Sequence, residues 1–302
     1  MMTSAKAALS HFARSTPSSD ASQTSAQGPA QSPAQSPAYV SYLRALRRRA
    51  MTIQLWQIGL VAALLILWEV APRAGWINPM LTSYPSAVAR TFVKMMEDGS
   101  LQTHTLATVI ETVVGFVGGM LLGIFCAVVL WWSSYLYRVL DPFIVVLNAI
   151  PKIALVPIFY IWLGDVASIY AMAIAISVFV TILMLYTGFQ SIDPDKIRLV
   201  RLFGASRLKV LTKIVLPGSV PTMIAALKVN VGLALVGVVV GEFQAAKEGL
   251  GYLITYGSQI FQMNLVMTAI VVLAVISSLL FAGIQWLEAT ALKRHGSGSS
   301  GN

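Results

Sequence analysis

Six long apolar runs constrain what this 302-residue chain can fold into more than any other feature of the sequence. A helix needs about 20 mainly apolar residues to cross a bilayer. The runs that meet this requirement are residues 53–71, 105–131, 139–163, 166–188, 218–242 and 266–288. Hydrophobic residues make up 57% of the chain and charged residues only 11%, so polar side chains are too few to cover a protein of this size in water. We therefore expect an all-α membrane protein with about six transmembrane helices.

The distribution of basic residues predicts the orientation of these helices. Six crossings place both ends of the chain on one side of the membrane, and cytoplasmic loops carry an excess of Lys and Arg. A cytoplasmic N-terminus puts the arginine cluster of residues 44–49 and the basic residues of 191–213 inside. The basic residues left outside are Arg73, Arg90, Lys94 and Lys247. We expect both termini in the cytoplasm, and we attribute the net charge of +9 to topology and anionic lipid rather than to nucleic acid.

Composition divides the chain into three parts. Residues 1–38 are rich in Ser, Ala, Pro and Gln and lack apolar periodicity, so we expect a disordered cytoplasmic tail. Residues 39–292 form the expected transmembrane domain. Residues 293–302 are expected to be a second tail whose final glycines and serines resemble a cloning scar. The first apolar run follows the arginine cluster and lacks a small-residue cleavage site, which predicts a retained anchor rather than a signal peptide.

The third apolar run is irregular because it holds Pro151 and Pro157. Each proline removes a backbone donor and kinks a helix, and such a defect is tolerated at membrane depth where protein or water satisfies the freed carbonyls. We expect this segment to line a cavity. The alternative is a kinked helix that serves only packing, since membrane helices carry more Pro than soluble ones.

Polar residues inside the apolar runs are candidates for a transport pathway. A charge at a helix centre costs roughly 2.5 to 3.5 kcal/mol on insertion scales, which applies to Glu111 and Lys152. We expect them to pair with each other, or Lys152 to face a pathway and attract an anion; snorkelling or purely structural pairing is the alternative. Glu242, at the end of the fifth run, could shape an outer gate or cap a helix end in water. Asn148 and Pro151 complete the set of pathway candidates, with interhelical hydrogen bonding as the simpler role for the amide.

The break between the fourth and fifth runs predicts a short, well-delimited helix. Asp193 is a good N-cap, Pro194 suits the first helical position, and Asp195 in the first turn favours the helix dipole. The helix should end at Gly204, where a chain commonly turns through a left-handed conformation. A second short helix should begin at Ser206.

The predicted helix is amphipathic. Ile197, Val200 and Phe203 share one face, whereas Arg198 and Arg201 lie three residues apart on another. One side can therefore pack against the protein while the other meets an acidic or polar groove. Taken alone, a basic helix of this kind is as readily a lipid-facing anchor.

The spacing that follows this helix adds a resemblance. Gly204 is separated by nine residues from residues 214–217, Ile-Val-Leu-Pro. This resembles the cytoplasmic "EAA" loop of the permease subunits of bacterial ABC importers, whose pattern is Glu-Ala-Ala, three residues, Gly, nine residues and Ile-x-Leu-Pro. The Glu-Ala-Ala positions are occupied here by Arg198, Leu199 and Val200. The glycine and the Ile-x-Leu-Pro therefore match, and the acidic start does not.

The resemblance extends over residues 66–292 and is closest to permeases of the nitrate, sulfonate and taurine type. The segments that carry it are Trp68-Glu69 and residues 84–88, 104–115, 141–157, 204–206, 239–243 and 249–253. Glu111 departs from the pattern, which has a basic residue there. The order and spacing of these segments carry the resemblance together.

The resemblance implies a type I importer fold with a coupling helix between the fourth and fifth transmembrane helices, in residues 191–216. It implies a bacterial inner-membrane complex of two permease copies, usually a homodimer, and two cytoplasmic ATPase subunits that carry ATP and Mg. A periplasmic or lipid-anchored binding protein would deliver a small solute. The residues it places at the ATPase are Asp195, Arg198, Arg201, Leu202, Gly204, Ala205, Ser206 and Arg207.

Other classes of function are disfavoured. The sequence has no Gly-x-x-x-x-Gly-Lys-Ser/Thr phosphate loop and no His, Cys, Asp or Glu cluster with metal spacing, so we expect no catalytic residue, metal or cofactor on this chain. The main alternative is an autonomous channel or ion-coupled carrier, although no internal repeat relates the two halves. A lysine at depth favours an anionic cargo such as a sulfonate, taurine, nitrate or an aromatic carboxylate, and heterocyclic vitamin precursors stay open.

Overall fold

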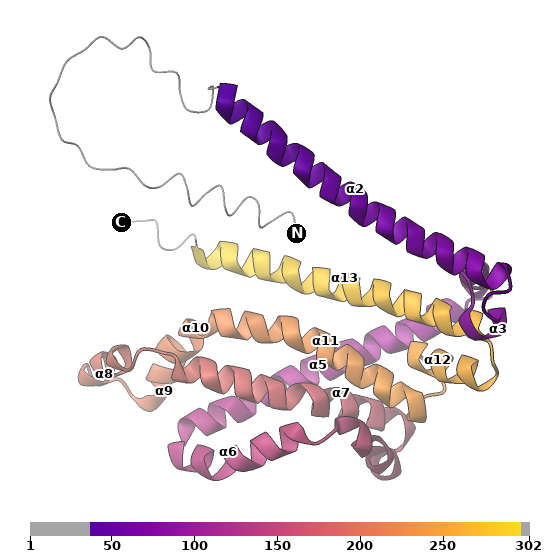
Figure 1. The fold of residues 1–302 in the computed structure, drawn as a ribbon. Helices are drawn as coiled ribbons and strands as arrows, with labels where there is room; N and C mark the ends of the chain where they lie inside the picture. The colour runs from indigo at the N-terminus through magenta and orange to yellow at the C-terminus, as the bar shows by residue number, and fades with distance from the viewer. Residues whose placement is uncertain (1–36, 297–302) are drawn as a thin grey trace, which may run out of the picture. The chain divides into compact units, whose positions relative to one another are not determined.

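The computed structural model describes residues 37–296, and every regular element in that part of the chain is a helix (Figure 1). Most of the predicted tails, residues 1–38 and 293–302, lies outside the described residues. α2 spans Pro37–Arg73 and α13 spans Met263–Gly296, so both terminal helices run a few residues past the predicted domain boundaries. The chain divides after Ala63 into two units, and the contacts described below lie within the second unit.

Five helical segments of the described chain are long and apolar enough to cross a membrane. They are Met51–Arg73 in α2, Ser100–Trp132 (α5), Lys152–Gln190, Val220–Ala245 (α11) and Met263–Ala289 in α13. Each overlaps one of the predicted runs, which confirms the all-α membrane fold. The predicted run at residues 139–163 is the one that forms no continuous helix.

That run is divided by its first proline. α6 (Ser134–Ala149) ends before Ile150 and Pro151, which are both extended, and a 3-10 turn, η2 (Lys152–Leu155), leads into α7 (Val156–Gln190). The break has a steric cause, because the residue before a proline is pushed out of the α region and Pro151 has no N–H to donate. Pro157 causes no break, since it lies in the first turn of α7, where a missing N–H costs nothing.

The divided segment still covers the length of the neighbouring helices. Tyr137, near the start of α6, stacks on Tyr186 near the end of α7, with ring centroids 3.8 Å apart. Asp165 follows a left-handed kink at Gly164 and pairs with Lys247, just beyond α11, at 3.0 Å. Residues 134–163 therefore return the chain from the Tyr186 end of α7 to its Asp165 end, and the third predicted run follows this path as two helical pieces.

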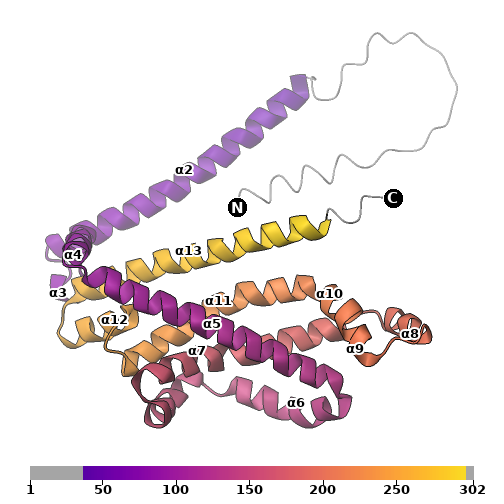
Figure 2. The ribbon, with the colours of Figure 1, turned by 180° about the vertical axis from the view of Figure 1, so that it is seen from behind.

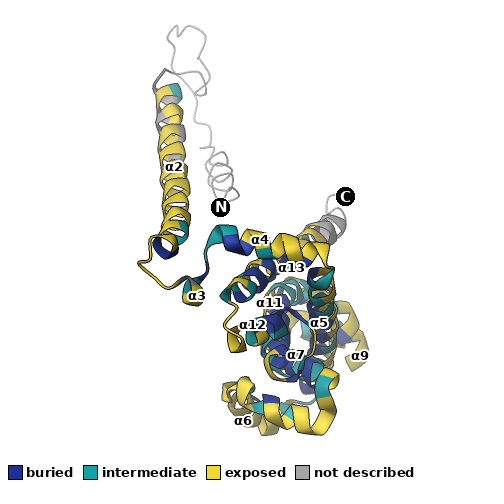
Figure 3. Cartoon of the chain, turned by 90° about the vertical axis from the view of Figure 1, so that its right-hand side faces the viewer, coloured by how far each residue is buried: buried dark blue, intermediate teal, exposed yellow. Residues whose placement is uncertain are grey.

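Helices α5, α7 and α11 form the packed centre, visible as the dark positions in Figure 3, whereas α6 has one buried residue, Ile144. Small residues allow the close approach of α5 and α7: the facing pairs are Gly115 with Ala173, Gly119 with Ser177 and Gly123 with Thr181. Gly237 of α11 lies against the backbone of Ala173 in the same way. Close packing of this kind is the main attraction between helices in lipid, where apolar burial gives little driving force.

The short helices gather at opposite ends of these long ones (Figures 1 and 2). One end, called the α8 end, holds α8 (Pro194–Leu202), α9 (Arg207–Val210), the π turn η3 (Leu211–Val215) and α10 (Leu216–Gly218). The other, called the α12 end, holds α3 (Pro79–Thr82), α4 (Pro85–Glu97) and α12 (Leu250–Gln259). Each end has its own apolar cluster, with Phe189 and Val215 in the first and Leu101 and Leu250 in the second.

Candidate functional sites

The first candidate site is α8 with the turn that follows it. Asp193 caps the helix, because its Oδ1 accepts the N–H of Asp195 at 2.9 Å, and Pro194 occupies the first turn. Gly204 has φ of +79°, the left-handed conformation predicted for the helix end. Ser206 then caps α9, its Oγ accepting the N–H of Lys209 at 3.4 Å. The predicted starts of both short helices and the left-handed turn at Gly204 are confirmed, and α8 ends at Leu202, one residue earlier than predicted.

The two faces of α8 differ from the prediction at one residue. Ile197 packs on the apolar cluster at the α8 end, as expected of the inner face, and Ala205, which was predicted to contact the ATPase, packs on the same cluster. Phe203 was expected to share that face, and this is wrong: its side chain is 83% exposed. The reason is local, because Phe203 is the C-cap of α8 and leaves the helical path, so the spacing of three residues no longer applies.

Apolar and basic side chains therefore share the exposed side of α8. Leu199, Leu202 and Phe203 are 56%, 85% and 83% exposed. Arg198 and Arg201 are exposed beside them, and Arg198 pairs with Asp195 at 3.1 Å. We call these five residues, Arg198, Leu199, Arg201, Leu202 and Phe203, the α8 surface.

A contact ties the turn after α8 to the long helices. The guanidinium of Arg207 lies over the ring of Trp132, 5.7 Å from its centroid. Trp132 is the last residue of α5, so this contact joins the start of α9 to the end of α5. The sequence singled out Arg207 as a docking residue, and the structure shows an intramolecular partner for it.

The second candidate site is the break between α6 and α7. Lys152 Nζ donates to the carbonyl oxygens of Leu147 at 3.0 Å and Asn148 at 2.5 Å, and lies 5.3 Å from the ring centroid of Phe179. The lysine thus caps the C-terminus of α6, where a positive charge favours the helix dipole. An open groove of about 480 Å³, lined almost entirely by apolar side chains, lies at this break. Its lining includes Leu147, Ile150, Lys152, Leu155, Phe159 and Phe179.

The expected pairing of Glu111 with Lys152 is not formed. Lys152 follows the helix break, so its side chain turns back onto the carbonyls of α6. Glu111, only 9% exposed, instead places its carboxyl group within hydrogen-bonding reach of that of Glu242.

Glu242 was predicted either to shape an outer gate or to cap a helix end in water. In the structure its carboxyl group caps the N-terminus of α12, and it does so in the protein interior. It is 1% exposed. Its Oε1 accepts the hydroxyl of Thr108 at 2.6 Å and its Oε2 accepts the N–H of Gly251 at 2.5 Å, in the first turn of α12. A carboxylate at a helix N-terminus satisfies free N–H groups and the helix dipole together.

Two further side chains of α5 complete this capping. The N–H of Gly249 donates to His104 Nδ1 at 3.0 Å, and the N–H of Leu250 donates to Thr108 Oγ1 at 2.8 Å. Three successive N–H groups at the start of α12 are therefore held by α5 and α11. We call His104, Thr108, Glu111, Glu242, Gly249 and Gly251 the α12 junction.

The sequence reasoning missed part of this junction. His104 and Thr108 were not candidates, although they precede Glu111 by seven and three residues and so lie on the same face of α5. That spacing, read with Gly249 and Gly251 after the fifth run, was the available signal. It also missed the ion pair of Lys228 with Glu288, at 2.6 Å, which joins α11 to α13.

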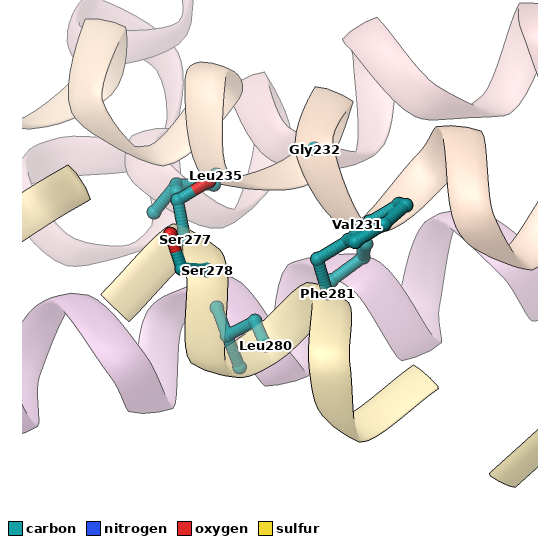
Figure 4. Close-up of a pocket in the computed structure, with 7 residues that line it drawn as sticks. All are labelled: Val231, Gly232, Leu235, Ser277, Ser278, Leu280 and Phe281. Atoms are coloured by element: carbon teal, nitrogen blue, oxygen red, sulfur yellow. The ribbon is translucent and has the colours of Figure 1, made fainter. Parts of the chain in front are cut away.

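Two other features of the described chain offer no polar site. A groove of about 230 Å³ between α11 and α13 is lined mainly by apolar side chains (Figure 4), and the Ser278 hydroxyl in it already donates to the Ala274 carbonyl of its own helix. Among the described residues, no group of three His, Cys, Asp or Glu side chains is placed to hold a metal ion.

Comparison with known proteins gives these features a context. Residues 119–292, more than half of the chain, match the family described as binding-protein-dependent transport system inner membrane component. A probable ABC transporter permease protein of Haemophilus influenzae is 31% identical over 229 residues, covering 76% of this chain and 93% of the relative. The putative aliphatic sulfonates transport permease SsuC of Bacillus subtilis is 26% identical, covering 79% and 87%. Other relatives are named for taurine, formylaminopyrimidine and riboflavin transport.

The fold has a counterpart among solved structures. A chain of the inward-facing MetNI methionine ABC transporter superposes with a TM-score of 0.55 over 63% of this chain and 94% of its own length, at 20% identity, so this likeness concerns the fold alone. The sequence matches identify the family directly. The chain belongs to the binding-protein-dependent transport system inner membrane components, and it is the permease component of an ABC importer.

Proposed function

We propose that this permease carries a small organic anion, with sulfonates as the first class to test, and that its α8 surface docks on a separate ATPase subunit. The observation that carries the docking proposal is the α8 surface itself. Leu202 and Phe203 are more than four-fifths exposed at the end of α8, which Asp193 caps at its start and which is followed by α9, capped by Ser206. Large apolar side chains held in this way outside the membrane-spanning segments are typical of a protein interface.

The charge distribution supports a cytoplasmic position for the α8 end. Six basic residues lie between residues 196 and 213, and the positive-inside rule favours the cytoplasm for such a loop. Both termini would then be cytoplasmic, and the α12 end would face the side from which a binding protein delivers the solute. The basic residues are Lys196, Arg198, Arg201, Arg207, Lys209 and Lys213.

The contacts around α8 suggest how ATP-driven movement reaches the membrane. ATP and Mg would bind to the two ATPase subunits, and their closure would draw the α8 helices of two permease copies together. Ile197 packs on the core cluster that includes Phe189 of α7, and Arg207 lies on Trp132 of α5. Movement of α8 is therefore transmitted as a rigid-body change of the long helices rather than absorbed by a loop.

The substrate class rests on two observations. Several relatives are named for sulfonate or taurine transport. Lys152 adds a positive charge to the lining of the groove at the α6–α7 break, with its Nζ held by the Asn148 carbonyl and Pro151 directly before it in the chain. We propose this break as the part of the chain that the solute passes, whereas Glu111 and Glu242 act from inside the protein through the α12 junction.

A matched pair of phenylalanine variants tests the docking proposal. Phe203 at the α8 end and Phe261 at the α12 end are 83% and 66% exposed, so Asn at either position should leave the melting temperature unchanged. The full-length protein is co-expressed with a candidate ATPase subunit from the same organism, and the amount of ATPase that co-purifies is measured. Phe203→Asn should reduce it roughly tenfold, as for an interface hot spot, and Phe261→Asn should not. Equal retention by both variants, or no ATPase with the unaltered protein, would contradict the proposal.

A further inference from the structure

We infer that Glu111 and Glu242 hold one proton between them, carried by Glu111 and donated to Glu242, and that this proton closes the α12 junction. The site is a proton-binding carboxyl pair that joins α5 to α11 and α12. The inference does not depend on which solute the protein transports.

The first argument is the burial of two acidic groups in contact. Glu111 and Glu242 are 9% and 1% exposed, and their carboxyl groups lie within hydrogen-bonding reach of each other. Two ionised carboxylates at that separation repel strongly where water is excluded. Buried acidic pairs avoid this cost by sharing a proton, as in aspartic proteases.

The second argument comes from counting donors and acceptors. Both oxygens of Glu242 already accept hydrogen bonds, from Thr108 and from the N–H of Gly251, so this carboxyl group is used as an acceptor. Glu111 Oε2 is buried and has no hydrogen-bond partner in the structure. A buried polar atom without a partner is rare and needs an explanation. A proton on Glu111, donated to Glu242, provides the missing hydrogen bond.

The third argument is that no described cation neutralises the pair. His104 on α5 uses Nδ1 to accept the N–H of Gly249, and Tyr252 on α12 stacks on its ring at 5.8 Å. Lys247 pairs instead with Asp165 of α7, and Glu248 in the same loop adds a negative charge nearby. Across the described residues, none of the ion pairs formed by Lys or Arg involves Glu111 or Glu242.

The fourth argument is a lack of space for anything larger than a proton. A Cβ atom added at Gly249 or at Gly251 would collide with the Glu242 carboxyl group. The backbone of the α12 N-terminus therefore lies directly against that carboxyl group, which leaves no shell of ligands for a metal ion there. Because α12 starts at this contact, any change that separates α5 from α11 must break the proton-mediated bond.

Infrared spectroscopy of the full-length purified protein tests where the proton resides. At neutral pH the unaltered protein should show the carbonyl absorption of a buried, protonated carboxyl group. Glu111→Gln should remove that absorption, and the exposed neighbour substitution Glu248→Gln should retain it. The inference is overturned if the absorption is absent from the unaltered protein or persists in Glu111→Gln.

Thermal melting provides a second measurement. The amide introduced by Glu111→Gln can donate to Glu242 in place of the proton, so this variant should melt close to the unaltered protein at neutral pH. At alkaline pH the unaltered protein should lose on the order of 5 °C as the proton leaves, and Glu111→Gln should not. Glu248→Gln should lose melting temperature at alkaline pH like the unaltered protein. The inference is overturned if Glu111→Gln melts lower at neutral pH than the unaltered protein, or if it shows the same alkaline loss as Glu248→Gln. Stabilisation of the unaltered protein by sodium over choline, which would indicate a metal cation, also overturns it.

Discussion

At the scale of single residues, the start of α12 depends on the absence of a side chain at two positions. Gly249 has φ of +115°, which L-residues with a side chain rarely adopt, and Gly251 lies against Glu242. A Cβ at Gly251 would come within 2.7 Å of Glu242 Oε2 and 2.9 Å of the Val239 carbonyl oxygen. Neither atom can move freely, since the carboxylate is held by Thr108 and the carbonyl belongs to α11.

Gly251→Ala should therefore destabilise the protein by about 1 to 3 kcal/mol, the usual cost of forcing an extra carbon into a packed site. For a domain of this size that lowers the melting temperature by roughly 2 to 12 °C. Gly283→Ala is the matched control, because a Cβ there meets nothing within 4 Å and Ala favours a helix interior. A melting temperature for Gly251→Ala equal to that of the control would show that α12 does not seat on Glu242 as described.

Residues whose conformation is set by their near neighbours were predictable from sequence, and residues set by distant contacts were not. Asp193, Gly204 and Ser206 mark the ends of α8 and α9 because caps and left-handed turns are local chemistry. Glu111 was recognised as costly at depth, but its partner Glu242 is 131 residues away, and no local pattern specifies that contact. The side chain of Lys152 could be placed only after the helix break was known.

At the scale of secondary-structure elements, the contact between α5 and α7 depends on three glycines spaced four residues apart. A Cβ added at Gly119 would collide with Ser177 Oγ and lie 3.2 Å from Ser177 Cβ. The Ser177 hydroxyl donates at 2.8 Å to Ala173, in its own helix, so it contributes little to holding the two helices together. The serine can therefore be shortened to make room for a larger residue at Gly119.

Gly119→Ala should cost about 1 to 3 kcal/mol of stability, and Ser177→Ala alone should cost much less. The double variant should recover a large part of the loss, with an interaction free energy of about 0.5 to 3 kcal/mol. Melting temperatures of the four proteins in one detergent measure this directly. Gly118→Ala, which meets only the flexible end of Ile174 at 3.1 Å, controls for helix propensity. Strict additivity of Gly119→Ala and Ser177→Ala would mean that these two residues do not face each other.

At the scale of the whole molecule, the apolar runs predicted the membrane-spanning segments because length and composition are all that a bilayer demands. The prolines predicted irregularity in the third run, but they did not predict that α6 would end at Ala149. They also did not predict that the rest of the run would join the fourth run in one helix, α7, kinked at Gly164. A helix can end at Ala149 only if the free carbonyl groups of its last turn find hydrogen-bond donors elsewhere. Lys152 is such a donor, because its Nζ donates to the carbonyl oxygens of Leu147 and Asn148.

Lys152 thus has two possible contributions, and they can be separated in the assembled transporter. As a helix cap it contributes about 0.3 to 1 kcal/mol to stability. As a charge beside a solute path it attracts an anion by up to about 4 kcal/mol at the effective dielectric of a protein surface. Lys152→Met should therefore lower the melting temperature only slightly and reduce uptake of a sulfonate at least tenfold. Lys152→Arg keeps the charge and should retain most of the uptake.

Uptake is measured in proteoliposomes that contain the permease, its ATPase and the saturated binding protein, so that delivery of the solute is not limiting. ATP hydrolysis in the same vesicles reports whether α8 still responds to the ATPase. If Lys152→Met transports at the unaltered rate with normal expression, the lysine is only a cap and the path does not pass the α6–α7 break. Loss of both uptake and ATP hydrolysis would instead show that the break transmits movement from α8, because a charge that acts only on the solute leaves basal hydrolysis intact.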